Sequence, residues 1–383
     1  MKILCIDQFA QLGGGQLCLL DLLPAFHRNG WEIRAMVPDQ GEYAARLRAS
    51  HCHVDQLPLP QLSNGKKTFT DQLRYLASVV RSTGQLRRLL RAWKADLLYV
   101  NGPRVLPAAA RVSREQEIPL IFHAHHWIAE TSARRLVQSS INASKASVIA
   151  CCQYVASSLS PRVPARRIKV IYNGVGDYRC SPARRCLPIK NVGIVGRIDP
   201  EKGQLDFVRA ARIIARRFPH VRFHVVGSPQ FSAGEYYAQV LNESQGLPVH
   251  FHGWRDDIST VLDSLDLLVV SSPGSEATPR VILESLSAGV PVLAYSVGGI
   301  PEILDNNQTG FLSAPTPDAL ASHLAEILET DPVVVELIAQ RACAVWRERF
   351  HIDRWRALVC DALTRAAIAN QPALATEQPQ MIL

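Results

Sequence analysis

Two glutamates with seven residues between them, Glu276 and Glu284, stand in the stretch 272–284, which joins a run of small residues to a helical pattern. An apolar run at 266–271 comes directly before this stretch and predicts a buried strand. Carboxylates bind sugar hydroxyls well, and a helix that starts beside the carboxyl end of a strand offers free backbone amides to a phosphate. The stretch therefore indicates a site for a sugar that is linked to phosphate.

Single residues predict where that helix begins and ends. Thr278 is a suitable N-cap and Pro279 suits the first helical position, so the helix is expected to start there. The apolar residues of 281–288 recur at helical spacing, Gly289 ends the pattern, and Pro291 prevents its continuation. A lone pair of glutamates at this spacing is most often a solvated loop and helix face, so the wider pattern has to decide.

Two cations follow another predicted strand, 192–196, and stand beside the start of the next helix: Arg197 and Lys202. Positive side chains at a helix N-terminus can neutralise a diphosphate and the charge that develops when it departs. An Arg-x4-Lys spacing is commonplace by itself. Together with the glutamates downstream it favours a diphosphate site.

The first part of the chain predicts one βαβ unit, with a strand at 2–7, a glycine-rich turn at 13–15, a helix at 17–28 and a strand at 31–38. Such a unit is expected to be a right-handed crossover in a parallel sheet. The spacing Gly-x-Gly-x-x-Gly is absent, so the turn is not a dinucleotide fingerprint. Three glycines allow a ligand to approach the backbone closely, and a tight structural turn is the alternative.

Three histidines lie at the end of a predicted strand at 120–125: His123, His125 and His126. Ligand sites of open α/β sheets gather at such strand ends. We expect His123 to turn into the sheet, and the register of the strand end is taken to favour His125, with His126 second, on the ligand side. A metal site is the alternative, but the sequence offers no matching ligands elsewhere.

The motifs form a larger pattern: Ser272-x3-Glu276-x7-Glu284-Ser-Leu-x-Ala-Gly-Val-Pro-Val, then Gly298-Gly299-Ile-Pro-Glu302, then Thr309-Gly310-Phe-Leu, preceded by Asn173-Gly174-Val175 and Gly196-Arg197-x4-Lys202-Gly203. This pattern closely resembles retaining GT-B glycosyltransferases of the large fourth family, the group 1 glycosyltransferases. That family includes mannosyl-, glucosyl- and N-acetylglucosaminyltransferases. The resemblance implies two Rossmann-like α/β domains that face each other across a cleft, with the donor in the C-terminal one and the acceptor mainly in the other.

The resemblance also implies roles for individual residues. Arg197 and Lys202 would stabilise the leaving nucleotide diphosphate, Glu276 would hold the sugar hydroxyls, Glu284 the ribose, and His125 would position or polarise the sugar. Transfer would retain the anomeric configuration, without a metal or other cofactor. The further residues expected at the donor are Gly14, Gly15, Trp254, Arg255, Pro279 and Arg280.

One departure from the family pattern concerns the sugar. Many members carry Gly-Phe-Gly or Gly-Phe-Pro after the first glutamate, whereas this chain has Ala277-Thr278-Pro279. Amides of that loop usually meet the sugar in the resembling enzymes, so the identity of the hexose stays open.

The predicted organisation is an acceptor-side domain at 1–176, a linker at 177–189 that is rich in Arg, Cys and Pro, and a donor domain at 190–345. A helix at 346–369, within a helical pattern over 333–369, is expected to cross back onto the first domain, and 370–383 is expected to be a loose tail. The remaining predicted elements are strands at 54–59, 96–100, 147–151, 169–172, 221–227 and 249–253 and a helix at 317–330.

Composition limits the class of protein. With 383 residues and 47% hydrophobic residues, the chain can form two globular domains, and no apolar stretch is long enough to span a bilayer. The first residues read as a strand and not as a signal peptide. Nine scattered cysteines without a Cys-x-x-Cys pair fit a reducing cytoplasm better than disulfides or a zinc site.

Charge is distributed unevenly along the chain. Residues 1–188 carry 26 Lys and Arg against 12 Asp and Glu, a net charge of +14, whereas residues 189–383 carry 16 against 22, a net charge of −6. A basic first half would attract an anionic membrane surface or a negatively charged acceptor, and a solubilising surface is the alternative. Nucleic acid is not expected, because the basic residues match no binding module.

The pattern at 84–94 predicts a basic amphipathic helix, with Leu86, Leu89, Leu90 and Trp93 in one stripe. Such a helix could lie on the inner face of the membrane as a peripheral anchor, or its stripe could face the protein core. The expected partners are a UDP- or GDP-linked sugar and a glycan or lipid-linked acceptor. A sugar-nucleotide epimerase of the same architecture and a binding subunit without turnover are the alternative functions.

Overall fold

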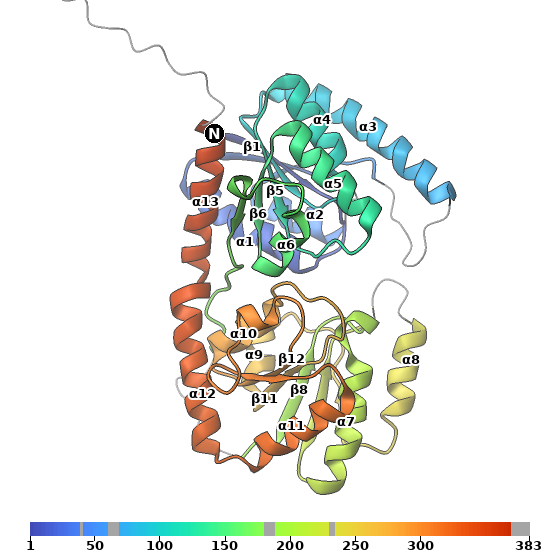
Figure 1. Ribbon diagram of the computed structural model, residues 1–383, viewed down its shortest axis with the longest axis vertical. Coiled ribbons are helices and arrows are strands. Elements are labelled where there is room, and N and C mark those ends of the chain that lie inside the picture. Colours follow the sequence, from blue (N-terminus) through green and yellow to red (C-terminus); the bar gives the residue numbers. More distant parts are fainter. Residues whose placement is uncertain (39–40, 60–68, 180–187, 230–233, 369–383) are drawn as a thin grey trace, which may run out of the picture.

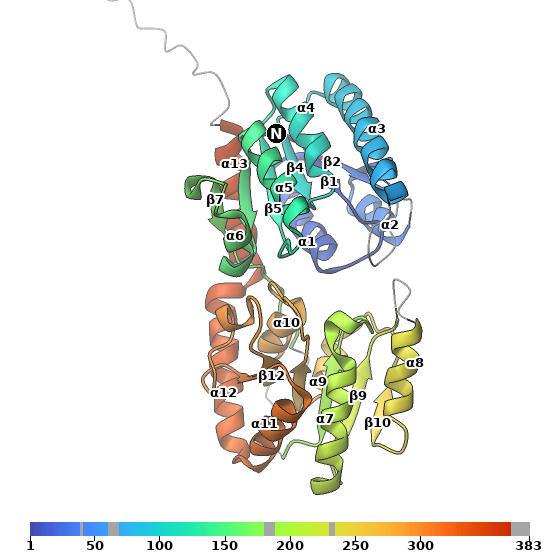
Figure 2. The ribbon, with the colours of Figure 1, turned by 45° about the vertical axis from the view of Figure 1, so that its right-hand side comes forward.

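The computed structural model describes residues 1–38, 41–59, 69–179, 188–229 and 234–368. Two α/β domains lie one above the other, and each is a parallel sheet with helices on both faces (Figures 1 and 2). Strands covered on both faces are largely buried: β11 is buried and apolar along its whole length, and in β1 the apolar run 3–6 is buried between Lys2 and Asp7. The tail predicted at 370–383 and residues 180–187 of the predicted linker lie outside the described residues.

The N-terminal sheet has the strand order β3-β2-β1-β4-β5-β6-β7, and all its neighbouring strands are parallel. Every strand predicted for this half is present: β1 has the predicted bounds, and the ends of the others are shifted by up to three residues. The strands are β1 Lys2–Asp7, β2 Glu32–Val37, β3 His53–Gln56, β4 Leu97–Asn101, β5 Leu120–Ala124, β6 Ser147–Ala150 and β7 Ile168–Val170.

The C-terminal sheet has the order β10-β9-β8-β11-β12-β13, also parallel throughout. No strands were predicted at β12 and β13, which have only four and three residues. The strands are β8 Asn191–Val195, β9 Arg222–Val226, β10 Val249–Phe251, β11 Leu267–Val270, β12 Val292–Tyr295 and β13 Phe311–Ser313.

Helices connect the strands and cover the sheets. Those of the first domain are α1 Gly14–Arg28, α2 Glu42–Ala49, α3 Phe69–Trp93, α4 Leu106–Gln116, α5 Thr131–Ser144 and α6 Gln153–Leu159. Those of the second domain and the C-terminus are α7 Gln204–Arg217, α8 Gly234–Glu243, α9 Ile258–Asp263, α10 Arg280–Ala288, α11 Pro317–Glu329, α12 Pro332–Val345 and α13 Ile352–Ile368. Short 3₁₀ turns lie at Ala165–Arg167, Pro200–Lys202 and Ile300–Glu302.

The helical pattern predicted over 333–369 is broken in the structure. A π-helical turn at Trp346–Phe350 follows α12, and the extended residue His351 then pairs with Val175 before α13 begins. The break lies where the chain passes from one core to the other: Trp346 and Phe350 pack in the second domain, and α13 packs in the first. The predicted crossing of the last helix onto the first domain is confirmed (Figure 1).

Helix α3 turns the predicted stripe of 84–94 inward. Leu86 and Leu90 are fully buried in the core of the first domain, and Leu89 and Trp93 pack against it. That stripe is therefore not a membrane-facing surface, because its apolar side chains are already covered by protein.

Candidate active site

Three loops meet at the carboxyl edge of the C-terminal sheet, after β8, β11 and β12, and glycines allow them to touch backbone to backbone. Gly203 has φ +70°, and a Cβ there would lie 1.9 Å from the carbonyl oxygen of Ser271. Gly298 has φ +57°, and a Cβ there would lie 2.0 Å from the carbonyl oxygen of Glu276, which also accepts a 2.8 Å hydrogen bond from the Gly299 amide. Only glycine fits both places, and the loop with Glu276 is thereby fixed from two sides.

The first cation and the first acid of the sequence motifs meet in this loop cluster. Lys202 Nζ lies 2.5 Å from Glu276 Oε1, and Ser272 Oγ donates a 2.7 Å hydrogen bond to the same oxygen. Both charged side chains are largely shielded from solvent. A carboxylate with one oxygen held by two donors keeps its second oxygen for further hydrogen bonds.

Arg197 follows β8 and lies near the same edge. Its backbone oxygen accepts a 2.6 Å hydrogen bond from Gln204 Nε2, and its guanidinium lies 3.8 Å from Glu201 in an exposed, solvent-screened contact.

Helix α10 begins one residue later than predicted. Pro279 is its N-cap and Arg280 its first residue, and no side chain caps it. The predicted cap was wrong, because the Thr278 hydroxyl instead donates a 2.9 Å hydrogen bond to the carbonyl oxygen of Cys151 in the other domain. Because this hydroxyl bonds across the domain boundary, it does not cap α10.

Glu284 lies one turn into α10 and is buried away from the Lys202–Glu276 pair. Arg280 Nε lies 3.4 Å from its Oε1, and Arg280 Nη1 makes a 2.7 Å ion pair with Asp21 of α1, in the other domain. Burial raises the pKa of Glu284, and the charge of Arg280 and a hydrogen bond with Tyr178 oppose that rise. The structure thus joins Glu284 to an acidic residue of the first domain that sequence reasoning missed, since Asp21 reads as an ordinary helix residue.

Gly14 and Gly15, which were predicted in a turn, form the start of α1, so this helix begins three residues earlier than predicted. These glycines, still called the glycine turn below, face the site. A Cβ at Gly14 would lie 3.9 Å from Arg280 Cδ, and a Cβ at Gly15 would lie 3.4 Å from the His125 ring. Both ring nitrogens of His125 are buried and have no hydrogen-bond partner. Burial, then the charges of His123 and His126, lower the pKa of His125 well below its ordinary value, so the ring is neutral at physiological pH.

The two other histidines differ in their surroundings. His123 is fully buried, and its Nδ1 lies 2.5 Å from the Tyr99 hydroxyl. Its ring centroid lies 4.0 Å from that of His125, because residues two apart in a strand share a face, so alternation does not separate these two histidines. His126 reaches solvent, yet the protein around its ring lowers its pKa; Glu276 opposes this shift, and Lys202 and Arg197 add to it. The response of His126 to charges of the other domain indicates that this side chain lies on the side of the donor loops.

A buried polar network, missed by sequence reasoning, supports the glycine turn. Asp7 at the end of β1 accepts hydrogen bonds from Phe9 N at 3.0 Å, Gln16 Nε2 at 2.9 Å and Asn101 Nδ2 at 2.5 Å. Asn101 Nδ2 also donates to Gly15 O at 3.1 Å. Polar residues at the ends of β1 and β4 were the available signal.

Trp254 and Arg255 lie after β10 at the surface. Trp254 is 47% exposed and its Nε1 donates to Asp256, while Arg255 forms a two-point ion pair with Asp257. Arg46 of α2 lies 3.6 Å from Asp256 across the domain boundary. The structure brings neither Trp254 nor Arg255 into contact with the Lys202–Glu276 pair.

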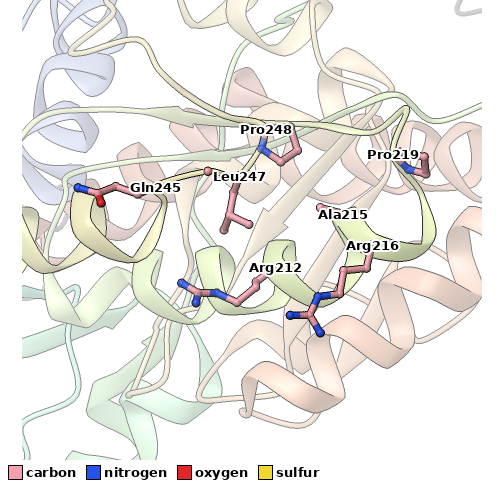
Figure 3. A pocket seen from close by; sticks show the side chains of 8 residues that line it. Arg212, Ala215, Arg216, Pro219, Gln245, Leu247 and Pro248 are labelled. Atoms are coloured by element: carbon pink, nitrogen blue, oxygen red, sulfur yellow. The ribbon is translucent and has the colours of Figure 1, made fainter.

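A surface hollow of about 680 Å³ lies elsewhere, between the end of α7 and the turn before β10. Figure 3 shows Arg212 and Arg216 side by side along α7 at its rim. Pro219 and Pro248 line it just before β9 and β10 start, so the hollow is at the amino edge of the sheet, opposite the glycine loops. It is separate from the candidate active site.

The described ranges contain neither a metal-binding cluster nor a membrane-spanning helix. Within residues 1–38, 41–59, 69–179, 188–229 and 234–368, no three His, Cys, Asp or Glu side chains are arranged to hold a metal ion. In the same part of the chain, no helix has the length and apolar character needed to cross a membrane.

Comparison with known proteins matches both halves of the chain. The model of glycosyl transferases group 1 matches residues 189–330, and that of the glycosyl transferase 4-like domain matches residues 13–174. A lipopolysaccharide 1,2-N-acetylglucosaminetransferase of Salmonella typhimurium is 25% identical over 66% of this chain and 71% of its own length. A UDP-Gal:alpha-D-GlcNAc-diphosphoundecaprenol alpha-1,3-galactosyltransferase of Escherichia coli is 27% identical over 61% of this chain and 66% of its own length.

A solved structure has the same two-domain architecture. HepE of Anabaena, crystallised with UDP and glucose, aligns with a TM-score of 0.80 and 26% identity over 95% of this chain and 99% of that chain. The fold and the motifs predicted from the sequence agree with these matches. The chain belongs to the group 1 glycosyltransferases and has their GT-B fold.

Proposed function

We propose that this glycosyltransferase moves a hexosyl unit from a UDP-sugar to a glycan or lipid-linked acceptor and retains the anomeric configuration. The observation that carries the proposal is the Lys202–Glu276 pair at the carboxyl edge of the donor-domain sheet, in loops that glycines bring together. UDP is preferred over GDP as the leaving nucleotide, because HepE binds UDP and the Escherichia coli relative is named for a UDP-sugar.

The residues divide the work by their chemistry. Lys202, with Arg197 nearby, supplies positive charge to the diphosphate as the bond to the sugar breaks, so these two residues could serve without a divalent metal. Lys202 contacts Oε1 of Glu276, so the other carboxylate oxygen can accept hydrogen bonds from sugar hydroxyls. Glu284 binds the ribose. Neutral His125, under the glycine turn, orients the sugar.

The transfer step needs no protein nucleophile. The acceptor hydroxyl attacks the anomeric carbon on the face from which UDP departs, and its proton passes to the departing phosphate oxygen. The sugar–phosphate bond breaks as the new glycosidic bond forms, so the anomeric configuration is kept.

A thermal-shift screen with UDP-, GDP- and ADP-sugars tests the donor. A ligand at a hundredfold excess over its dissociation constant adds about 2.7 kcal/mol of stability. Arg197→Ala is expected to lose most of the UDP-sugar response, whereas Arg209→Ala, which removes a surface ion pair of α7, keeps it. An unchanged response in Arg197→Ala contradicts the diphosphate site.

Product analysis separates transfer from the alternatives. NMR of the product anomer is expected to show retention, and an inverted product would overturn the mechanism. A donor that is epimerised or hydrolysed without any acceptor would identify an epimerase. A donor that binds and stays intact with all acceptors would identify a binding subunit.

We further propose that the acceptor side rests on an anionic membrane through α3. Leu73, Leu76 and Val80 are 50%, 58% and 72% exposed on this helix. Further along the same face, Arg88 lies eight residues beyond Val80 and Arg91 three residues beyond Arg88, and both are exposed as well. An apolar patch continued by cations is complementary to an anionic lipid surface. This face replaces the stripe at 84–94, and both figures place α3 on the flank opposite α13.

Flotation with phosphatidylglycerol vesicles tests this face. The triple variant Leu73→Glu, Leu76→Glu, Val80→Glu is expected to lose vesicle binding. The matched control changes Val333, Val334 and Leu337 of α12 to Glu; these are similarly exposed at 50%, 46% and 45% but stand beside Glu336. Equal binding by both triple variants, or none by the wild type, rules out the α3 surface.

A further inference from the structure

A buried polar cluster joins the two domains where α10 meets α1. It contains Cys18 and Asp21 of α1, Arg280 and Glu284 of α10, and Tyr178, whose backbone amide donates to Ser287 Oγ at 3.2 Å. Arg280 and Glu284 have side chains only 11% and 10% exposed, so their charges are shielded from solvent. Ion pairs at this depth persist only with good partners, because unpaired buried charge is costly.

Arg280 lies closer to Asp21 than to Glu284. Its bond to Asp21 is 2.7 Å, the usual length of a charge-assisted hydrogen bond, and its Nη1 also lies 4.0 Å from Cys18 Sγ. Its distance to Glu284 is 3.4 Å, and Arg280 Nε has no hydrogen-bond partner. Asp21 therefore fixes the guanidinium. The Glu284 carboxylate is close to its charge and has a hydrogen bond with Tyr178, and the lone pairs that remain can accept from another donor.

We infer that Arg280 is a positioning residue for the donor: clamped by Asp21 of the opposite domain, it holds Glu284 ionised and in place to accept the two ribose hydroxyls. This rests on the proposed role of Glu284 in binding ribose. One consequence is that the nucleotide site is complete only when the two domains are together. The acceptor-side domain thus contributes to donor affinity without touching the nucleotide.

The charges around Glu284 affect its pKa in opposite directions, so two variants should change its protonation in opposite ways. Burial raises the pKa of Glu284; Arg280 and Tyr178 lower it, and Asp21 raises it. Cys18 also faces this cluster, and burial raises its own thiol pKa to about 11, so it stays neutral. Removing Arg280 should therefore favour the protonated carboxyl, and removing the charge of Asp21 should favour the carboxylate.

The experiment measures the dissociation constant of UDP-glucose by calorimetry from pH 5.5 to 8.5. This donor has both phosphates esterified, so its own charge does not change in that range. Arg280→Gln is expected to move the pH profile to higher pH, and Asp21→Asn to lower pH. Glu302→Gln is the control, because Glu302 also bridges the domains but contacts backbone amides of α6 instead of Glu284.

A second readout compares UDP with 2′-deoxy-UDP. The wild type is expected to prefer UDP about tenfold, the effect of one hydrogen bond to a charged group, and Arg280→Gln to lose that preference. Parallel pH profiles in all variants, or an unchanged preference in Arg280→Gln, would overturn the inference while leaving the proposed function intact. Failure of the wild type to bind any UDP compound would instead remove the proposed function.

Discussion

Lys202 and Glu276 lie 2.5 Å apart although 74 positions separate them in the chain, and they belong to loops after different strands. The contact depends on Gly203, whose missing side chain lets the Lys202 loop meet the backbone of Ser271. The cation assigned to the diphosphate and the acid assigned to the sugar are thus held as one unit. A donor that enters this site has to draw Lys202 from the carboxylate toward its phosphates, and the carboxylate then becomes available to the sugar.

Replacing Glu276 with Gln should separate binding from turnover. The amide cannot hold sugar hydroxyls as strongly as a carboxylate, so we expect transfer to fall by about a hundredfold or more. UDP affinity should stay the same or rise, because Lys202 loses its competing partner. Steady-state kinetics with UDP-glucose and calorimetry with UDP measure the two effects. If UDP affinity falls in step with turnover, Glu276 has a structural role instead.

Replacing Gly203 with Ala should disturb the site through the backbone alone. A Cβ would lie 1.9 Å from the Ser271 carbonyl oxygen, so the loops would have to move apart. Gly246 provides the matched control, since its φ of +73° resembles the +70° of Gly203 but nothing lies within 4 Å of its Cβ position. We expect Gly246→Ala to cost about 1 kcal/mol of unfolding free energy from backbone strain, and Gly203→Ala to cost more and to abolish the UDP thermal shift. Equal costs with an intact shift would show that the close contact is unimportant.

Removing the carboxylate of Glu302 should loosen the start of α6. Its two oxygens accept 2.7 Å hydrogen bonds from the amides of Gln153 and Tyr154, and Tyr172 donates to it at 2.8 Å. Glu302→Ala is expected to cost about 1–2 kcal/mol, as for a lost helix cap. Hydrogen exchange should accelerate at the two α6 amides. Tyr172→Phe is the comparison, in which both amides keep their acceptor and their slow exchange.

The sequence predicted most of the fold because its signals were local. Apolar runs ended at polar or glycine residues, and all the predicted strands of both domains are present. The contacts between domains could not be predicted in this way. Threonine is a common N-cap residue, but the hydroxyl of Thr278 donates to the carbonyl oxygen of Cys151 instead. No local sequence pattern reveals that partner.

In the candidate site, too, contacts within one domain were predictable and contacts between domains were not. Lys202 and Glu276 were expected in one place and are in contact, since both follow strands of a single sheet. Arg280 was expected at the donor, and the structure places its guanidinium on Asp21 of α1. Asp21 carries no signal of its own in the sequence, because an acidic residue on an amphipathic helix is usually solvated. Its role depends on how two separately folded domains meet.

Buried Asp7 should make the stability of the protein depend on pH in a direction opposite to that of most aspartates. Burial raises its pKa from 3.8 to about 6, against the hydrogen bonds from Phe9, Gln16, Asn101 and Tyr43. Between these values the folded state holds a proton that the unfolded state has released, so this contribution to the unfolding free energy falls as pH rises. A pKa difference of this size corresponds to about 3 kcal/mol.

The measurement is urea unfolding of the wild type and Asp7→Asn between pH 4 and 6.5. The amide that this substitution introduces cannot titrate, and it stands among groups that donate to Asp7, so the absolute stability of the variant is not the readout. The stability of the wild type relative to Asp7→Asn should decline by up to about 3 kcal/mol over this range. A difference that stays flat or grows with pH would mean that the hydrogen bonds outweigh burial and keep Asp7 ionised throughout. The network would then be an anionic support for the glycine turn at every pH at which the enzyme works.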